Sequence, residues 1–502
     1  MKLFKKLASF ILAFAMVMAI AMPSVVMAVD NYTITITPTT SDHTYEAYQI
    51  FEGKLSNDKL SDIKWGNAIT EDGQTELKKE YNATDAADLA EKLSEFDTES
   101  EQIKAFAKKA SKYLQNPTTA KAEGNTATIT VNKAGYYLIK DEDASLDKKD
   151  ETYTEFILKV VKNQTVAPKS SKPTSEKKVK DINDSEGTTM TDWQDSADWD
   201  IGDEVPFQLK GTVAADYDNY KVYKMTFHDH QSNGLTFDED SVKVYVNGKL
   251  VADKTKYEVV TEGLEAGCTF EVKFADLKQI PGVTAGSTIT VEYESVLNDR
   301  AFIGSEGNPN TMYMEFSNNP NDEQGGETGK TPEDKVIVFT YKTVINKVGP
   351  GGNALEGAEF KLEKKVGDGD HWVEKAVVKN DAGTIFTFTG LDDGVYRLTE
   401  TKTPEGYNTM NPNPLEFTIS ATHEVTAANP QLLDLSGNPN SGNVTFDSNL
   451  ENASLTTNIV NKSGSTLPET GGMGTTVLYA AGTLMILAAA AFLVMKKKAD
   501  SK

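Results

Sequence analysis

Short stretches of alternating apolar and polar residues recur along most of the chain. Residues 32–36 alternate Tyr or Ile with Thr, and residues 242–246 alternate Val with Lys or Tyr. A period of two predicts strands that bury one face. Asn247-Gly248 directly follows the second stretch and predicts a type I′ hairpin turn. The hydrophobic pattern therefore favours a mainly β protein.

A helical pattern interrupts the strands in the first third of the chain. Thr98 and Glu101 fit a capping box, and apolar residues then recur at helical spacing over 103–114. Asn116-Pro117 is expected to end this helix. The alternating pattern returns at residues 127–131, 136–139 and 154–161. We predict a β-rich N-terminal domain that carries helical insertions.

Two segments rich in turn-forming and polar residues, 165–176 and 321–333, indicate linkers. They divide residues 29–464 into three predicted domains, residues 29–167, 172–330 and 335–464. In the second and third, short strands such as residues 385–388 and 396–399 alternate with Gly- and Asp-rich turns. This spacing predicts tandem immunoglobulin-like β-sandwiches.

Both ends of the chain carry apolar stretches. Residues 1–28 show the order of a secretory signal peptide, with lysines, an apolar run and then small residues. A retained membrane anchor is the alternative for this stretch. Residues 475–495 are long and apolar enough to cross a bilayer. The Lys-rich tail, residues 496–502, is predicted to stay in the cytoplasm, which leaves the domains outside the membrane.

The balance of charges narrows the choice of partners. The chain has 75 acidic and 51 basic residues, a formal net charge of −24. This balance argues against nucleic acid and anionic lipid as partners. Cys268 is the sole cysteine, so no internal disulfide can form, although extracellular proteins often rely on such a staple. We predict Cys268 to be a buried small residue rather than a nucleophile.

A five-residue motif stands just ahead of the predicted membrane span: Leu467, Pro468, Glu469, Thr470 and Gly471. Together with the span and the Lys cluster, it resembles the sortase sorting signal of Gram-positive surface proteins. The resemblance implies that a sortase cysteine attacks the Thr470 carbonyl and releases the chain from Gly471 onward. The thioester formed splits a difficult transpeptidation into two easier steps.

Residues 153–164 resemble the pilin motif of Spa-type major pilins. Tyr153 is followed by apolar strand residues, and a lysine and an asparagine stand nine and ten positions later. The resemblance implies that Lys162 links one subunit to the next. One difference is Val161, where the family usually has Pro. The alternative lysines nearby are Lys159, Lys169 and Lys172.

The second predicted domain begins at 175–181 and ends at 314–320 with sequences that resemble a fimbrial isopeptide-formation domain. In that family a first-strand Lys bonds to a last-strand Asn beside an acid. The resemblance implies a bond from Lys177 to Asn318 with Asp229 as the acid. Alternation puts Lys177 on one strand face with Val179, and Asn318 on one with Phe316 and Met314, which supports this choice of partners. Lys178 and Asn319 remain competing neighbours.

The third predicted domain resembles a Cna-B-type sandwich over residues 345–360, 394–407 and 455–461. The resemblance implies a bond between Lys347 and Asn461 with Glu400 as the acid. An apolar core favours the neutral amine and the protonated acid. The amine can then attack the Asn carbonyl while ammonia leaves. Such bonds would replace the missing disulfides; whether the first domain has its own bond stays open.

Taken together, the motifs resemble a Spa-type, LPXTG-anchored major pilin with tandem Cna-type sandwiches. The expected partners are a pilin-specific sortase, a housekeeping sortase, identical subunits, minor pilins and peptidoglycan. The alternatives are a singly displayed wall-anchored adhesin and a minor or basal pilin. A transfer enzyme is a third possibility, but the only catalysis implied is each domain acting once on itself.

No cofactor or metal is expected. His228 and His230 could share a strand face as a metal pair, but the sequence indicates no third ligand. Asp368 and Asp370 lack the ligand spacing of a calcium loop, so a turn is the better interpretation. The host surface ligand is not identified by any motif.

Overall fold

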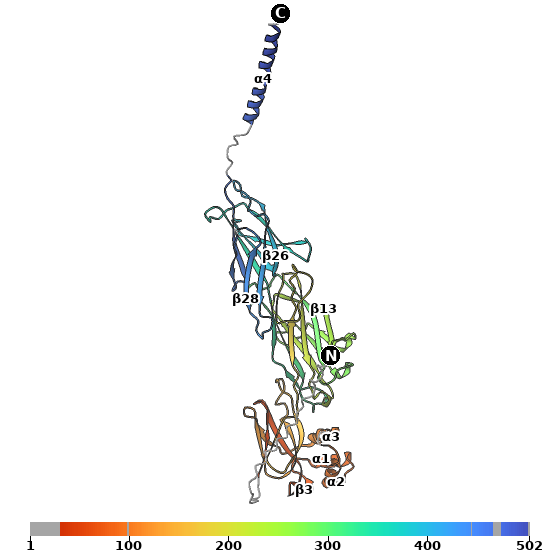
Figure 1. Cartoon of the computed structure of the whole chain (residues 1–502). Coiled ribbons are helices and arrows are strands. Elements are labelled where there is room, and N and C mark those ends of the chain that lie inside the picture. Colours follow the sequence, from red (N-terminus) through yellow and green to blue (C-terminus); the bar gives the residue numbers. More distant parts are fainter. Residues whose placement is uncertain (1–30, 98–99, 443, 465–472, 500–502) are drawn as a thin grey trace, which may run out of the picture.

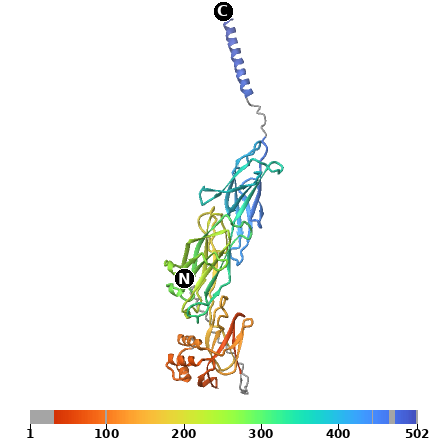
Figure 2. The ribbon, with the colours of Figure 1, turned by 180° about the vertical axis from the view of Figure 1, so that it is seen from behind.

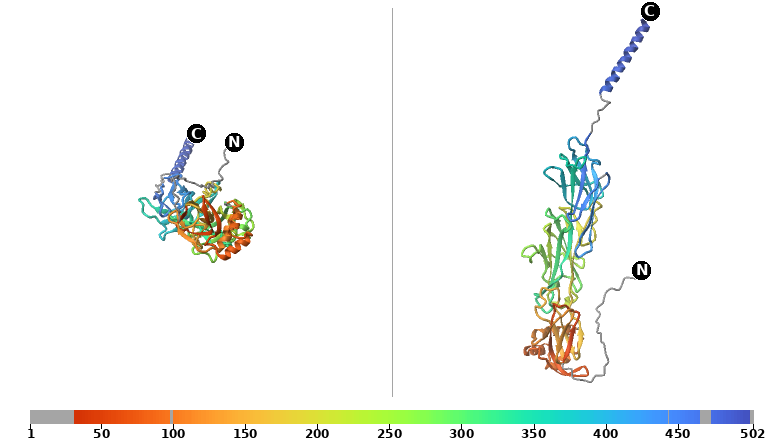
Figure 3. Two further views of the ribbon diagram at one scale, coloured as in Figure 1. Left: turned by 90° about the horizontal axis from the view of Figure 1, so that it is seen from below. Right: turned by 90° about the vertical axis from the view of Figure 1, so that its left-hand side faces the viewer.

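The computed structural model describes residues 31–97, 100–442, 444–464 and 473–499. The predicted signal peptide, the sorting motif from Leu467 to Gly471 and the predicted cap Thr98 lie outside these residues. Three domains follow one another along an elongated rod, with the N-terminal domain at one end (Figure 1). The view from behind and the side view show the same order (Figures 2 and 3). The expected fold class, mainly β with tandem sandwiches, is confirmed.

The N-terminal domain contains two sheets, ordered β5-β1-β8 and β3-β2-β6-β7, with β4 beside β2. Its helices pack on one side of the second sheet (Figure 1). The strands are β1 (Tyr32–Ile36), β2 (Thr44–Ser56), β3 (Lys59–Trp65), β4 (Thr118–Lys121), β5 (Ala127–Val131), β6 (Gly135–Asp141), β7 (Glu155–Val160) and β8 (Gln164–Val166), and the helices are α1 (Glu71–Glu80), α2 (Ala86–Leu93) and α3 (Glu101–Ala110). The predicted helical insertions are confirmed. Ser100 caps α3, since its Oγ accepts a hydrogen bond from Ile103 N.

The second domain is a sandwich of two sheets around one large apolar core. The first sheet has the order β10-β20-β18-β12-β16-β15, with β19 beside β18, and the second β14-β13-β17-β11-β9. The strands are β9 (Ser175–Val179), β10 (Ser196–Asp198), β11 (Glu204–Thr212), β12 (Met225–Gln231), β13 (Leu235–Val246), β14 (Lys249–Leu250), β15 (Glu258–Val260), β16 (Phe270–Phe274), β17 (Thr288–Leu297), β18 (Asn308–Ser317), β19 (Thr328–Lys330) and β20 (Asp334–Phe339). The predicted hairpin turn at Asn247-Gly248 is confirmed, since both residues have positive φ.

Two predicted boundaries of the second domain need correction. Strand β20 pairs with β18, so this sandwich extends to Phe339 and the next domain starts at Tyr341, not at residue 335. The Gly- and acid-rich residues 321–333 form a loop and β19 within the domain rather than a linker. The segment between β8 and β9 is likewise shorter than predicted, because both strands reach into residues 165–176.

The third domain is a second sandwich, with sheets ordered β24-β25-β21-β30-β29 and β23-β22-β26-β27-β28. The strands are β21 (Tyr341–Val348), β22 (Glu359–Lys365), β23 (Trp372–Lys375), β24 (Val377–Lys379), β25 (Ile385–Leu391), β26 (Gly394–Lys402), β27 (Leu415–His423), β28 (Leu432–Pro439), β29 (Asp447–Asn449) and β30 (Ser454–Val460). The first strand, β21, lies parallel to the last, β30, with Lys347 opposite Ile459. Parallel pairing brings the start and the end of this domain side by side.

A buried ion-pair cluster joins the second and third domains. Lys364 of β22 is fully buried, and its Nζ lies 2.9 Å from Asp200 Oδ2 and 2.9 Å from Asp392 Oδ2. Asp184 of the second domain contacts the same Nζ at 2.5 Å. Breaking a buried pair leaves an uncompensated charge, so this junction resists bending.

The C-terminal helix α4 (Met473–Ala499) is long and apolar enough, over Leu478–Lys497, to cross a membrane. It is the one such helix among the described residues. Its length fits the predicted span over 475–495.

Candidate functional site

The second domain buries a lysine, an aspartate and a tyrosine in contact with one another. Strand β9 turns Lys177 and Val179 into the core, and Lys177 is fully buried. Its Nζ contacts Asp229 Oδ2 from β12 and lies 2.9 Å from the hydroxyl of Tyr293 on β17. That hydroxyl donates to Asp229 Oδ2 at 2.9 Å. The structure thus brings Lys177 and Asp229 together and excludes Lys178, whose Nζ binds Asp195 at the surface.

The structure does not bring Asn318 to this cluster, and the expected partner needs correction. Asn310 on β18 is fully buried, and its Nδ2 donates to the Tyr293 hydroxyl at 2.9 Å. Its Oδ1 has no hydrogen-bond partner. Asn310 and Lys177 therefore contact the same phenol oxygen, and Asn310 becomes the candidate partner of Lys177.

Asn318 follows the end of β18, eight residues beyond Asn310, which is roughly 26 Å along a strand. Its Nδ2 donates to Leu146 O at 2.8 Å and to Glu151 O at 3.1 Å, and its main-chain carbonyl accepts from Tyr153 N at 2.8 Å. Asn318 thus holds a loop of the first domain against the second. The competing Asn319 binds Glu327 Oε2 and also lies outside the cluster.

Burial shifts the titration of the pair toward its neutral forms. Desolvation lowers the pKa of Lys177 and raises the pKa of Asp229, and the mutual attraction of the pair only partly opposes these shifts. The rings of Phe207 and Tyr293 lie 5.6 and 5.4 Å from the lysine nitrogen. A neutral amine and a protonated acid are the forms that attack on the Asn310 carbonyl requires.

The third domain contains an equivalent cluster, with the three residues that its sequence implies. Lys347, Glu400 and Asn461 are all buried. Asn461 Nδ2 donates to Glu400 Oε1 at 2.6 Å, and Lys347 Nζ lies 3.9 Å from the same oxygen. Glu400 is fixed through Oε2, which accepts from Met410 N at 2.7 Å. Asn461 Oδ1 has no hydrogen-bond partner, so the structure brings these three residues together.

Burial lowers the pKa of Lys347 to about 8. The fraction of neutral amine therefore rises about tenfold per pH unit well below that value, reaches one half there and approaches its maximum above it. If the amine attacks Asn461, the rate of bond formation in freshly folded chain should rise about tenfold per pH unit below about 8 and level off above it. A time course of intact mass after refolding measures this rate. Asn461→Ala chain, which can react only in the second domain, is the control; a rate independent of pH would contradict this role for Lys347.

Lys162 lies in the bend between β7 and β8 of the first domain and is exposed. Asn163 Oδ1 accepts from Thr33 N at 2.9 Å, and Gln164 Nε2 donates to Lys159 O at 2.9 Å. These bonds fix the bend on both sides of Lys162. Among the described residues, the Lys162 side chain has no hydrogen-bond or ion-pair partner.

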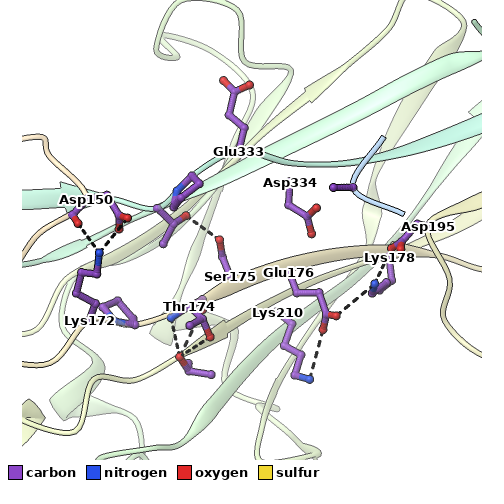
Figure 4. Close-up of a pocket in the computed structure, with 15 residues that line it drawn as sticks. Asp150, Lys172, Thr174, Ser175, Glu176, Lys178, Asp195, Lys210, Glu333 and Asp334 are labelled. Atoms are coloured by element: carbon purple, nitrogen blue, oxygen red, sulfur yellow. Dashed lines mark hydrogen bonds and ion pairs between the residues drawn. The ribbon is translucent and has the colours of Figure 1, made fainter. Parts of the chain in front are cut away.

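Two of the alternative lysines are engaged. Lys159 Nζ donates to Asp58 O at 2.9 Å. Lys172 lines a pocket of about 940 Å³ between the domains and donates to Asp150 O at 2.9 Å and to Asp150 Oδ2 at 3.2 Å (Figure 4). Lys169 is also in contact with its surroundings. Lys162 therefore differs from its neighbours in having a free amine.

Lys162 and the end of the third domain lie toward opposite ends of the rod. Strand β7 starts near the junction with the second domain, where Tyr153 binds Asn318, and runs away from it for about 20 Å. At the other end, Val395 on β26 contacts Ser185 of the second domain, and β26 then runs away toward Gly406. Gly464, the last described residue before the sorting motif, donates its N–H to Gly406 O.

In the first domain, no buried lysine contacts a buried asparagine among the described residues. Lys140 is its buried lysine, and it pairs with Asp143 and Glu46. The described part of this domain thus offers no third cluster of the same kind.

Three segments match known protein families. Residues 201–320 match the Cna-B-like domain of Gram-positive pilin backbone subunit 2, and residues 342–431 match the SpaA prealbumin-like fold domain. Residues 459–502 match the LPXTG cell wall anchor motif. The chain therefore carries a segment similar to a pilin backbone domain, a prealbumin-like domain and a cell wall anchor motif. The first match contains Asp229, Tyr293 and Asn310 but begins after Lys177. The second contains Lys347 and Glu400, and the third contains Asn461 and the sorting motif. None of the three matched families is an enzyme family.

The chain is 30% identical over 281 residues to the trypsin-resistant surface T6 protein of Streptococcus pyogenes. The aligned part is 53% of this chain and 49% of the relative, so it spans about half of that protein. Two solved structures share the fold. The T6 backbone pilin of S. pyogenes has 19% identity and a TM-score of 0.56, covering 87% of this chain and 99% of that one. The major pilin SpaD of Corynebacterium diphtheriae has 18% identity and a TM-score of 0.51, covering 86% and 98%.

Proposed function

We propose that the chain is a major, or backbone, pilin subunit that a sortase polymerises head to tail and that is finally fixed to the cell wall. The observation that carries this proposal is the free, exposed amine of Lys162, toward the opposite end of the rod from Gly464 and the anchor motif. A subunit built this way extends a fibre by its own length with each bond. A singly displayed adhesin needs the anchor motif but no such amine.

The proposed linkage takes two steps. A pilin-specific sortase cysteine attacks the Thr470 carbonyl, the Thr470–Gly471 peptide bond breaks, and the new amine leaves with Gly471. The neutral Lys162 amine of the next subunit then attacks the thioester carbonyl, forming an amide and releasing the cysteine thiol. A housekeeping sortase would transfer the completed fibre to peptidoglycan, and minor pilins are further partners.

Internal bonds would carry tension through each subunit. In the second domain we propose an amide between Lys177 and Asn310 with Asp229 as the acid, and in the third one between Lys347 and Asn461 with Glu400. In each, the neutral amine attacks the Asn side-chain carbonyl. The acid protonates the leaving nitrogen and takes up a proton from the attacking nitrogen, so that ammonia departs and the acid is regenerated. Each reaction occurs once per domain, so the chain is not a turnover enzyme. The buried contacts among these side chains support both assignments.

An SDS-gel immunoblot of cell wall extracts tests the proposal. Native chain, expressed with its sortases, should give a ladder of high-mass bands, and Lys162→Ala should reduce the ladder to monomer. Lys159→Ala, which removes a nearby amine already bound to Asp58, should keep the ladder. A ladder that survives Lys162→Ala would assign the link to another lysine, and a single band from native chain would favour the adhesin.

A further inference from the structure

A second group of chemically active side chains lies on the opposite face of the same strand as Asp229. Strand β12 turns Asp229 into the core and His228 to the outer face of the sheet. The cross-strand partner of His228 on β16 is Glu271. Cys268 lies in the turn that leads into β16. Three residues separated by up to 43 positions thus meet on one surface of the second domain.

We propose that His228, Cys268 and Glu271 form a binding site for Zn²⁺. His228 Nδ1 lies 3.1 Å from Glu271 Oε1 and 3.9 Å from Cys268 Sγ. All three donor atoms lie within 4.8 Å of one another. In tetrahedral zinc sites, bond lengths of about 2.0–2.3 Å put donor atoms about 3.3–3.8 Å apart. The observed spacing therefore fits an ion with small side-chain movements.

The surroundings of His228 fix the ring in the orientation that a metal ligand needs. His228 is 5% exposed. The Tyr313 ring stacks on the imidazole, with 4.5 Å between the ring centroids. Nε2 has no hydrogen-bond partner and lies 3.7 Å from Glu315 Oε2. Stacking on Tyr313 limits rotation of the ring, and the nearby Glu315 carboxylate favours a proton on Nε2, which leaves the other nitrogen for the metal. Here that other nitrogen is Nδ1, which faces Cys268 and Glu271.

Glu271 is also held in place. It is 2% exposed, its Oε1 accepts from Glu265 N at 3.0 Å, and its Oε2 lies 2.7 Å from Lys273 Nζ. Glu265 Oε2 lies 3.9 Å from His228 Nδ1, so this carboxylate or a water molecule could supply the fourth ligand. Glu265 also binds Lys330 and Tyr313, which keeps it beside the site.

The donor set determines which cation fits. Imidazole, thiolate and carboxylate together suit Zn²⁺, whereas Ca²⁺ and Mg²⁺ prefer oxygen ligands alone. Binding would replace the thiol proton of Cys268 by a bond to the metal and release one proton. Cys268 is only partly buried, so the ion can enter from solvent. A bound ion would join β12, β16 and the turn before β16.

The single cysteine makes the site directly testable. The full chain, purified in detergent without an affinity tag, is alkylated with iodoacetamide with and without added Zn²⁺. We expect Zn²⁺ to slow alkylation of Cys268 by at least about tenfold, because a metal-bound thiolate is occupied. Mg²⁺ at the same concentration should not change the rate.

Ligand variants distinguish this site from weak binding to the acidic surface. His228→Gln and Glu271→Gln should each weaken the protection about tenfold or more, and His371→Gln, which changes an exposed histidine of the third domain, should leave it intact. Circular dichroism checks that each variant is folded. If His228→Gln does not fold, the protection measured for Glu271→Gln tests the site. Equal alkylation rates with and without Zn²⁺, or protection that survives both ligand variants, would overturn the proposal.

Discussion

The exported chain is expected to have an intact mass about 34 Da below the value calculated from its residues, since each of two internal bonds releases one ammonia of about 17 Da. Asn310→Ala should reduce this deficit to about 17 Da, because the second domain then has no amide carbonyl beside Lys177. Asn318→Ala should keep the full deficit, because Asn318 binds the loop of the first domain instead. Mass spectrometry of the three intact proteins measures all of these values.

The two variants are matched, since each replaces one buried asparagine at or just beyond β18. A full deficit in Asn310→Ala together with a halved deficit in Asn318→Ala would restore the pairing implied by the sequence. A native mass equal to the calculated value would reject internal bonds in both domains. Where a mass deficit is found, peptide mapping locates each bond through the joined peptides that contain Lys177 or Lys347.

The sequence predicted well which face of a strand each residue occupies. Alternation put Lys177 on the buried face with Val179, and the structure buries Lys177 while Lys178 reaches Asp195. The period of side chains along a strand fixes this choice locally. The family resemblance also implied the three residues of the third-domain cluster. In the structure Lys347 lies on β21, and Asn461 directly follows β30, the parallel neighbour of β21.

Position along a strand was harder to predict. Asn310 and Asn318 are an even number of residues apart, so alternation alone puts both on the same face and cannot distinguish them. Which of the two asparagines faces Lys177 depends on how β9 in one sheet is placed along the length of β18 in the other. Strand pairing between residues far apart in the sequence sets that placement. Tyr293, which contacts both Lys177 and Asn310, comes from a third strand and had no local signal at all.

The same dependence on long-range strand pairing explains why the sequence did not indicate the other candidate ligands beside His228. The sequence suggested a pair of histidines but no third donor. Glu271 becomes a neighbour only through the pairing of β12 with β16, and Cys268 only through the turn before β16. The domain boundary near residue 335 failed for a related reason, since only its pairing with β18 assigns β20 to the second sandwich.

Glu400→Ala is expected to lower the free energy of unfolding of the third domain by about 4–5 kcal/mol. The proposed bond between Lys347 and Asn461 closes a loop of more than 100 residues, and a cross-link over about 100 residues restricts the unfolded chain by about 4.7 kcal/mol. One kcal/mol corresponds to about 4–8 °C for domains of 60–100 residues and to about 2–4 °C for domains of 150–250 residues. The third domain lies between these sizes, so its melting temperature should fall by at least about 10 °C. Calorimetry of the full chain measures the change, and Glu405→Ala, in an exposed turn nearby, should melt like the native chain.

Part of any loss in Glu400→Ala could come from its hydrogen bond to Met410 N rather than from the missing cross-link. Asn461→Ala separates the two causes, because it prevents the same bond while Glu400 remains. If both variants act by removing one cross-link, the double variant should be only slightly less stable than either single variant, since their effects are not additive. Losses that add in the double variant would show that Glu400 and Asn461 stabilise the domain through independent contacts, and that no bond joins Lys347 to Asn461.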